Sequence, residues 1–307
     1  MSTRIVFMGS PEFALPSLRL LASQYTVAGV VTQPDRAAGR GRELKPPPVK
    51  SLALELGLPV IQPERLRLPE AMEALRRFAP DLIVVAAFGQ ILRPEVLDLP
   101  AYGCLNVHAS LLPRWRGAAP INAAILHGDR ETGVTIMRMD PGLDTGPTLS
   151  YRATPIGEDE TAGELYARLS ELGADLLIHT IPGYLKGDLD PRPQPEEGVT
   201  YAPMLKKEDG LLDFSRPAEE LARRVRAFHP WPGPFFQWNG STLQVLRARA
   251  EAGTARPGKT LVHLGQPAVG TSNGILILDE VQPPGKKPMP GKAFLSGARS
   301  WTESKIS

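Results

Sequence analysis

From residue 4 to residue 139 the chain alternates apolar runs of strand length with segments of helical spacing, and this alternation constrains the fold more than any other feature. Runs rich in Val, Ile, Leu and Phe predict buried strands at 4–9, 26–33, 59–62, 81–88, 104–110 and 131–139. Apolar residues that recur every three or four positions predict helices at 11–23, 49–57, 68–79, 118–128 and 161–187. Apolar strands separated by helices are typical of a parallel sheet covered on both faces. We therefore expect an α/β fold with a Rossmann-like, mostly parallel sheet.

A proline-rich break at 190–203 separates this part from the rest, since it holds four prolines and no apolar periodicity. Beyond it, one helix is predicted at 217–228, and short strand-like runs separated by Gly and Pro turns follow. This pattern is typical of a small β-barrel of the OB-like kind. The predicted organisation is an N-terminal domain at 1–189, a linker at 190–206 and a C-terminal β-barrel domain at 207–307.

Composition excludes several classes of protein. No apolar run reaches the roughly 18 residues of a membrane span, and the N-terminus lacks the apolar core of a signal peptide. The single cysteine, Cys104, forms neither an internal disulfide nor a cysteine-based metal site, so a cytoplasmic protein is expected. The net charge of +2 is uneven, because residues 207–307 carry 14 Lys+Arg against 9 Asp+Glu. A basic C-terminal part suggests an anionic partner, although a solubilising surface explains the same surplus.

The predicted strand at 104–110 presents an unusual set of polar side chains. Alternation places Asn106, His108 and Ser110 on one face of the strand, near the carboxyl end where α/β sheets bind ligands. An amide donor beside an imidazole can polarise a carbonyl group and stabilise the oxyanion that forms when a nucleophile attacks it. The alternative is a core histidine and asparagine whose hydrogen bonds are satisfied by the protein.

A carboxylate in the tight loop MDPGLDTGP, which follows the strand at 131–139, strengthens the catalytic interpretation. Asp144 there can reach the imidazole and hold it in one tautomer, or it can simply close a turn. The nucleophile motif GxSxG is absent, which favours a site that activates an incoming nucleophile. The first turn, GSPEF, lacks GxGxxG, so neither a nicotinamide nor a flavin cofactor is predicted.

The segment TQPDRAAGRGRELKPPPVK at 32–50 is predicted to be a long basic loop without secondary structure. Gly39 and Gly41 favour flexibility, and a proline run stiffens its end. A flexible basic loop near strand ends is better suited to bind a phosphate backbone than a small neutral metabolite. The simpler explanation is a solvent-exposed loop without a ligand. Its basic residues are Arg36, Arg40, Arg42, Lys45 and Lys50.

Five segments together resemble the methionyl-tRNA formyltransferase family: FMGSPEFALPSL, TQPDRAAGRGRELKPPPVK, FGQIL, LNVHASLLPRWRGAAPI and MDPGLDTGP. The resemblance extends over nearly the whole chain, because the linker and the β-rich C-terminal third also fit the layout of the family. The Asn, His and SLLP core with its downstream Asp is shared by folate-dependent formyltransferases. The basic loop and PRWRGAAPI indicate the tRNA-directed branch. Trp115 stands where the family usually has Tyr, which keeps an aromatic ring.

The resemblance implies transfer of the formyl group of 10-formyltetrahydrofolate to the α-amino group of methionine on initiator tRNA, with no metal. It implies catalytic roles for Asn106, His108 and Asp144. The residues that it implies for folate binding are Ser110, Leu111, Leu112, Pro113, Phe88, Leu92 and Asp140. Those expected to bind tRNA are Arg36, Arg40, Arg42 and Lys45, together with the C-terminal domain. A monomer without a membrane partner is expected.

Three alternatives share part of these features. A formyltransferase for a small amine needs no basic loop, and a formyltetrahydrofolate hydrolase replaces the amine with water. A non-catalytic tRNA-binding protein would not need Asn106, His108 and Asp144 intact. The bases that such a protein would recognise in tRNA, and the part played by residues 301–307, do not follow from the sequence.

Overall fold

The computed structural model describes residues 3–38, 43–303 and 306. The chain forms two compact units, which are described separately. The first comprises residues 1–117, 132–155 and 166–201, and the second comprises residues 118–131, 156–165 and 202–307. The second unit therefore includes segments from both sides of the predicted linker. The domain limits predicted from the sequence, 1–189 and 207–307, remain predictions.

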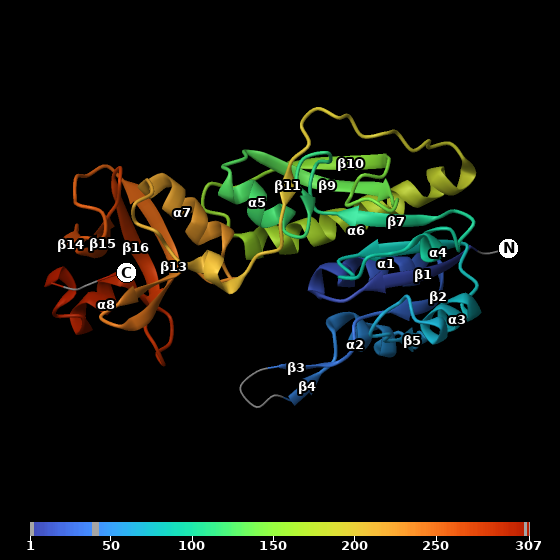
Figure 1. The fold of residues 1–307 in the computed structure, drawn as a ribbon, viewed down its shortest axis with the longest axis horizontal. Helices are drawn as coiled ribbons and strands as arrows, with labels where there is room; N and C mark the ends of the chain where they lie inside the picture. The colour runs from blue at the N-terminus through green and yellow to red at the C-terminus, as the bar shows by residue number, and fades with distance from the viewer. Residues whose placement is uncertain (1–2, 39–42, 304–305, 307) are drawn as a thin grey trace. The chain divides into compact units, whose positions relative to one another are not determined.

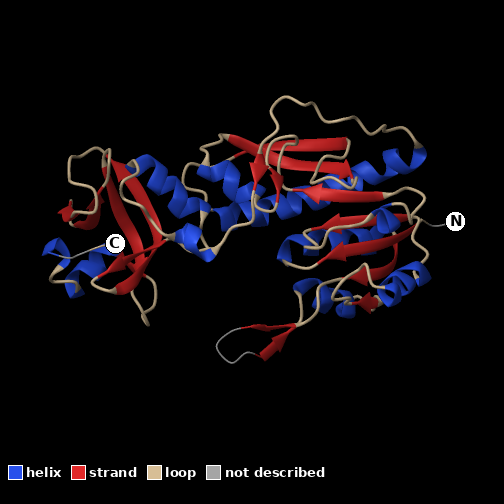
Figure 2. Cartoon of the chain, viewed as in Figure 1, coloured by secondary structure: helices blue, strands red, loops and turns tan. Residues whose placement is uncertain are grey.

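The first unit is built on a seven-stranded sheet with the strand order β10-β9-β7-β6-β1-β2-β5 (Figures 1 and 2). The pairs β2–β5, β1–β2, β1–β6 and β6–β7 are parallel, and β9 runs antiparallel to β7. The mostly parallel sheet predicted from the sequence is thus confirmed. Its strands are β1 (Arg4–Gly9), β2 (Thr26–Val31), β5 (Val60–Ile61), β6 (Leu82–Ala86), β7 (Cys104–His108), β9 (Glu131–Arg138) and β10 (Thr148–Pro155).

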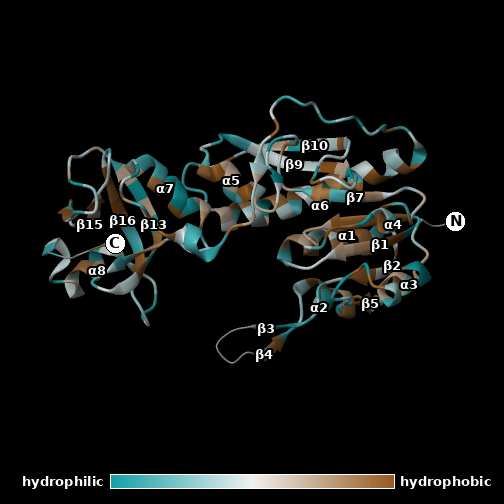
Figure 3. Ribbon diagram, in the orientation of Figure 1, coloured by the Kyte–Doolittle hydropathy of each residue, from teal (hydrophilic) through white to brown (hydrophobic). Residues whose placement is uncertain are grey.

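Helices cover this sheet because its strands bury apolar side chains on both faces, and the hydrophobic colour gathers on the central strands in Figure 3. On one face Val6 and Ile83 pack in a core cluster with Met72 and Leu75 of α3. On the other face Gly173 of α6 lies so close to Val107 of β7 that a Cβ atom would approach that side chain within 2.7 Å. The helices are α1 (Leu15–Gln24), α2 (Pro48–Glu55), α3 (Pro69–Arg77), α4 (Pro94–Leu97) and α6 (Ala162–Lys186).

The prediction of a loop without secondary structure at 32–50 is wrong. The segment contains an antiparallel hairpin of β3 (Arg36–Ala38) and β4 (Glu43–Lys45), which extends away from the body of the first unit in Figure 1. The pattern did not reveal it, because all three residues of β4 are exposed and no face of that strand carries an apolar stripe. Strand β10 was also missed, since only alternate positions of this edge strand are shielded.

The second unit contains the curled antiparallel sheet that corresponds to the predicted small barrel. Its strand order is β12-β13-β16-β15-β14, with β17 beside β16. These strands are β12 (Phe235–Trp238), β13 (Ser241–Glu251), β14 (Thr260–His263), β15 (Gln266–Gly270), β16 (Ile275–Gln282) and β17 (Met289–Pro290). Its helices are α5 (Pro120–Leu126), α7 (Ala218–Ala227) and α8 (Gly291–Gly297).

The core of the second unit includes a residue from the uninterpreted C-terminal stretch. Trp301 is only 1% exposed and packs with Phe294 and Trp238. Its indole Nε1–H donates a 2.8 Å hydrogen bond to the carbonyl of Leu261. Trp301 therefore closes the core of this unit. Within the part of the chain that the structure describes, no helix has the length and apolarity needed to span a membrane.

Candidate active site

The site is built around the carboxyl end of β7 and the loop that follows it. Asn106 is half-buried, and His108 is 5% exposed. Thr135 of β9 holds the loop, since its hydroxyl donates to the carbonyl of Ser110 at 2.7 Å and accepts from the amide of Leu112 at 3.2 Å. The Ser110 hydroxyl donates to the carbonyl of Arg114 at 2.6 Å. Ser110 thus shapes the loop, whereas the Asn106 side chain has no hydrogen-bond partner among the described residues.

The imidazole of His108 is fixed at one nitrogen and faces a carboxylate with the other. Its Nε2 lies 3.0 Å from the carbonyl oxygen of Trp115, and because a carbonyl only accepts, Nε2 carries the hydrogen. Its Nδ1 lies 3.6 Å from Oδ2 of Asp144. The backbone of Trp115, and not Asp144, therefore sets the tautomer of the neutral ring. The Nδ1 lone pair faces Asp144.

Asp144 lies in a loop whose backbone is tightly constrained. Its φ of 51° is in the left-handed region, and its Oδ2 accepts a 2.8 Å hydrogen bond from the amide of Gly117. The carboxylate is 16% exposed. Two bonds to Oδ1 of Asp140, from the amide of Gly142 at 3.0 Å and the hydroxyl of Thr145 at 2.7 Å, close the turn. Asp140 thus shapes the loop that carries Asp144.

Sequence reasoning missed two residues that contact this site from the predicted linker. Gln194 donates from Nε2 to the carbonyls of Asp144 and Gly146, at 2.8 Å each. Thr200 accepts the amide of Trp115 at its hydroxyl, at 2.9 Å. These contacts join segments that are far apart in the sequence, so no local pattern predicts them. The one feature of the linker that could have drawn attention is a single glutamine, Gln194, among prolines.

Five of the seven residues expected to bind folate fall into two groups. The side chains of Phe88 and Leu92 are buried in the core cluster on one face of the sheet, while the carbonyl of Phe88 accepts a 3.1 Å hydrogen bond from Nε2 of Gln33. The second group, Leu111, Leu112 and Pro113, is partly exposed on the loop after β7. Asp140 is partly exposed as well, whereas Ser110 is buried.

Two of the residues expected to bind tRNA lie on the β3–β4 hairpin. Arg36 and Lys45 are exposed and stand opposite each other in the ladder, whereas Arg40 and Arg42 lie outside the described residues. Lys50 instead pairs with Asp35 at 2.7 Å, at the base of the hairpin. A hydrogen bond from Gln62 and then that from Lys50 lower the pKa of the Asp35 carboxyl.

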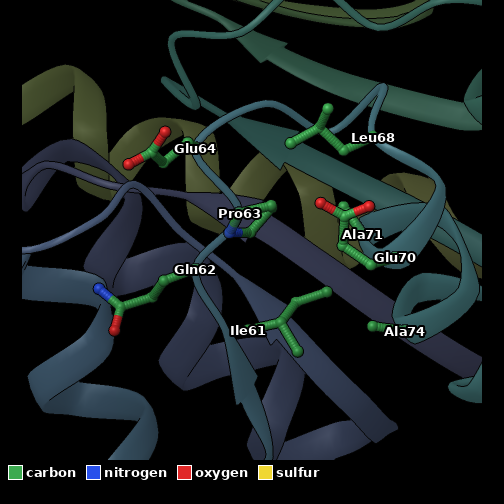
Figure 4. Close-up of a pocket in the computed structure, with 8 residues that line it drawn as sticks. All are labelled: Ile61, Gln62, Pro63, Glu64, Leu68, Glu70, Ala71 and Ala74. Carbon is green, nitrogen blue, oxygen red and sulfur yellow. The ribbon is translucent and has the colours of Figure 1, made fainter.

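A surface pocket lies elsewhere in the first unit, between β5, the segment after it and α3 (Figure 4). No predicted site residue lines it, and its polar character comes from Glu64 and Glu70 beside Gln62. Among the residues that the structure describes, no cluster of three or more His, Cys, Asp or Glu side chains is suited to a metal ion.

Comparison with known proteins identifies the class to which this fold and site belong. Residues 3–181 match the family model described as formyl transferase, and residues 204–299 match that of the formyl transferase C-terminal domain. Among solved structures, the sugar 3N-formyl transferase WlaRD in the presence of dTDP and 5-N-formyl-THF is similar in fold. Its TM-score is 0.67 at 18% identity, over 94% of this chain and 100% of that chain. The architecture is thus that of a formyl transferase.

Curated relatives narrow the class further. The methionyl-tRNA formyltransferase of Myxococcus xanthus is 51% identical over 96% of this chain and 95% of its own length. That of Halorhodospira halophila is 52% identical over 97% of each chain. The chain therefore belongs to the methionyl-tRNA formyltransferase family.

Proposed function

We propose that this chain transfers the formyl group of 10-formyltetrahydrofolate to the α-amino group of methionine carried by initiator tRNA. Full-length similarity to methionyl-tRNA formyltransferases supports the reaction. The observation that carries the proposal is the arrangement at the end of β7, where the Nδ1 atom of His108 faces the Asp144 carboxylate and the half-buried Asn106 amide lies on the same strand face.

In the proposed mechanism the neutral amine attacks the formyl carbon, and the side-chain N–H of Asn106 stabilises the oxyanion that forms. The attacking nitrogen must lose a proton, and the Nδ1 lone pair of His108 accepts it because Nε2 already carries a hydrogen. Asp144 stabilises the resulting imidazolium across the 3.6 Å separation.

Collapse of the tetrahedral intermediate breaks the bond between the formyl carbon and the folate nitrogen. That nitrogen leaves as an amine and takes the proton from Nδ1 of His108, which returns the imidazole to its starting state. His108 thus gains one proton from the attacking amine and returns one proton to the leaving folate nitrogen. In this mechanism Asn106, His108 and Asp144 are catalytic residues, and no metal takes part.

Folate is proposed to bind along the loop after β7, at Ser110, Leu111, Leu112 and Pro113, with Asp140 at the facing loop. Because the side chains of Phe88 and Leu92 are buried in the core cluster, their part in folate binding is proposed to be indirect. The initiator tRNA is proposed to contact the basic hairpin through Arg36 and Lys45, with Arg40 and Arg42 from the same segment. The basic surplus of residues 207–307 adds to this attraction.

The deciding experiment incubates the protein with labelled 10-formyltetrahydrofolate and one of three acceptors. These are charged initiator tRNA, an amino-sugar nucleotide and water alone. We expect label in methionyl-tRNA only, at a rate that falls steeply with salt because several phosphates are neutralised. Label in the amino-sugar nucleotide, or release of formate without an acceptor, would contradict the proposal.

Substitution tests the catalytic roles within this assay. Asn106→Ala and His108→Ala are each expected to lower kcat by roughly a hundredfold or more, the scale of losing one oxyanion donor or the proton acceptor. Glu55→Gln, an exposed change on α2 outside the site, serves as the control. A variant at Asn106 or His108 with near-normal kcat would remove that residue from the mechanism.

A further inference from the structure

The segment at 194–200, here called the strap, contacts both halves of the site. On one side, Nε2 of Gln194 donates to the carbonyls of Asp144 and Gly146, at 2.8 Å each. On the other side, the Thr200 hydroxyl accepts the amide of Trp115 at 2.9 Å, and the Trp115 carbonyl holds Nε2 of His108. The strap therefore joins the loop of Asp144 to the partner of His108.

Only one orientation of the Gln194 side-chain amide matches its donors and acceptors to those of its partners. Its Oε1 accepts from Nε and Nη2 of Arg116, at 3.0 and 2.7 Å, and a guanidinium only donates. Its Nε2 faces two carbonyls, which only accept. Arg116 is 8% exposed and has no carboxylate partner among the described residues, so Gln194 is its principal side-chain contact.

The strap is itself anchored to the sheet. Arg192, two residues before Gln194, exchanges two 2.8 Å backbone hydrogen bonds with Thr148 of β10. The carbonyl of Thr200 accepts the amide of Arg116 at 2.9 Å. Both ends of the strap are thus held by backbone pairing, which gives its side chains a fixed base.

The backbone of the two loops requires such support. Asp144 and Trp115 both have positive φ, at 51° and 62°. Non-glycine residues in the left-handed region cost free energy and persist only where the surrounding structure holds them. The contacts of Gln194 and Thr200 are made to these two residues.

We propose that Gln194 and Thr200 are positioning residues that set the spacing between His108 and Asp144. Neither residue needs to touch substrate. Gln194 fixes the carboxylate by holding the Asp144 backbone, and Thr200 fixes the imidazole through Trp115. In this proposal the strap is part of the active site and not merely a linker between the two parts of the chain. This inference deepens the proposed formyl transfer and depends on it for its kinetic test.

The first test is Gln194→Glu. One carboxylate oxygen still accepts from Arg116, which preserves the partner of that buried cation, while the other faces the carbonyls of Asp144 and Gly146 and repels them. We expect kcat to fall by about thirtyfold to a hundredfold, the scale of a misplaced catalytic group. KM for folate and for tRNA should stay within about twofold of wild type, because a positioning residue contributes no substrate contact.

The second test is the matched pair Thr200→Val and Thr200→Ser. Valine has the shape of threonine without its hydroxyl, whereas serine keeps the acceptor for the Trp115 amide. We expect Thr200→Val to lower kcat by about tenfold and Thr200→Ser to restore it, in line with a small displacement of the imidazole. Equal kcat in the two variants would show that the hydroxyl contact does not position the site.

A third measurement does not depend on turnover. The amide of Gly117 donates to Oδ2 of Asp144, so its hydrogen exchange reports the position of that carboxylate. In Gln194→Glu we expect its exchange rate to rise at least about tenfold, with the amides of β1 unchanged as the control. Unchanged exchange together with wild-type kcat would overturn the inference. If the wild-type protein shows no formyl transfer, but the Gly117 amide still exchanges faster in Gln194→Glu, only the proposed function is overturned.

Discussion

At the residue scale, the site separates two tasks within one imidazole ring. Nε2 of His108 is occupied by the Trp115 carbonyl, so the proposed mechanism assigns proton transfer to Nδ1, which lies beside Asp144. The carboxylate is therefore not needed to choose the tautomer. The role that we propose for it is electrostatic, and that role can be tested without disturbing the loop.

Asp144→Asn isolates this electrostatic role. The amide oxygen of asparagine can still accept the Gly117 N–H, so the loop should keep its shape. A neutral side chain does not stabilise an imidazolium, and we expect kcat to fall by about a hundredfold or more while folate affinity largely persists. Equilibrium folate titration and kcat at saturation measure the two effects. Weak folate binding with normal turnover would instead make Asp144 a ligand-binding residue.

Cys104 gives an independent test of how firmly β7 is held. The thiol lies in the same strand as Asn106 and His108, and burial raises its pKa to about 12. At pH 8 almost none of it is thiolate, the reactive form, so we expect iodoacetamide to leave the native protein unlabelled over hours. In denaturant, labelling should finish within minutes. Rapid labelling of native protein would show that β7 opens locally.

At the element scale, the base of the β3–β4 hairpin is held by one carboxylate. Asp35 accepts from Lys50 and Gln62, and these contacts lower its pKa. A lowered pKa means that the charged form stabilises the folded state at pH values above the unfolded pKa. That contribution is lost as the pH falls through the folded pKa.

Asp35→Asn is therefore expected to reduce stability at pH 7 and to matter little in acid. The Tm of the variant should lie below that of wild type at pH 7, and the difference should shrink as the pH falls below about 4. Amide exchange in β3 and β4 should also quicken at pH 7. Glu64→Gln, at an exposed glutamate, is the control. A pH-independent difference in Tm would attribute the effect to something other than the charge of Asp35.

The elements that sequence reasoning predicted are those with strong apolar patterns. The parallel strands were found because they are buried on both faces, and Asn106 and His108 were placed together because a strand alternates sides. The hairpin and β10 were missed because exposed or edge strands need few apolar residues. Gln194 could not be found, since its partner Asp144 lies 50 residues away and no local pattern encodes that contact.

At the scale of the whole molecule, the second compact unit includes residues that precede the predicted linker. Helix α5 precedes the linker in sequence, yet it belongs to the second unit and packs against α7. The side chain of Asn122 donates a 2.7 Å hydrogen bond to the carbonyl of Ala227 at the end of α7. Ile121 and Ile125 of α5 are buried in the intact chain.

A chain truncated after Pro203 tests this arrangement, because it keeps the strap and α5 but removes α7. Its α5 loses its packing partner and exposes apolar surface, at a cost of about 25 cal/mol for each Å². We expect a Tm at least several degrees below that of the full chain and a tendency to aggregate. Asn122→Ala in the full chain should have a smaller effect in the same direction, through the lost hydrogen bond. Adding residues 204–307 as a separate fragment should restore part of the lost stability. A monomeric truncated chain with the Tm of the full protein would show that residues 118–131 fold without α7.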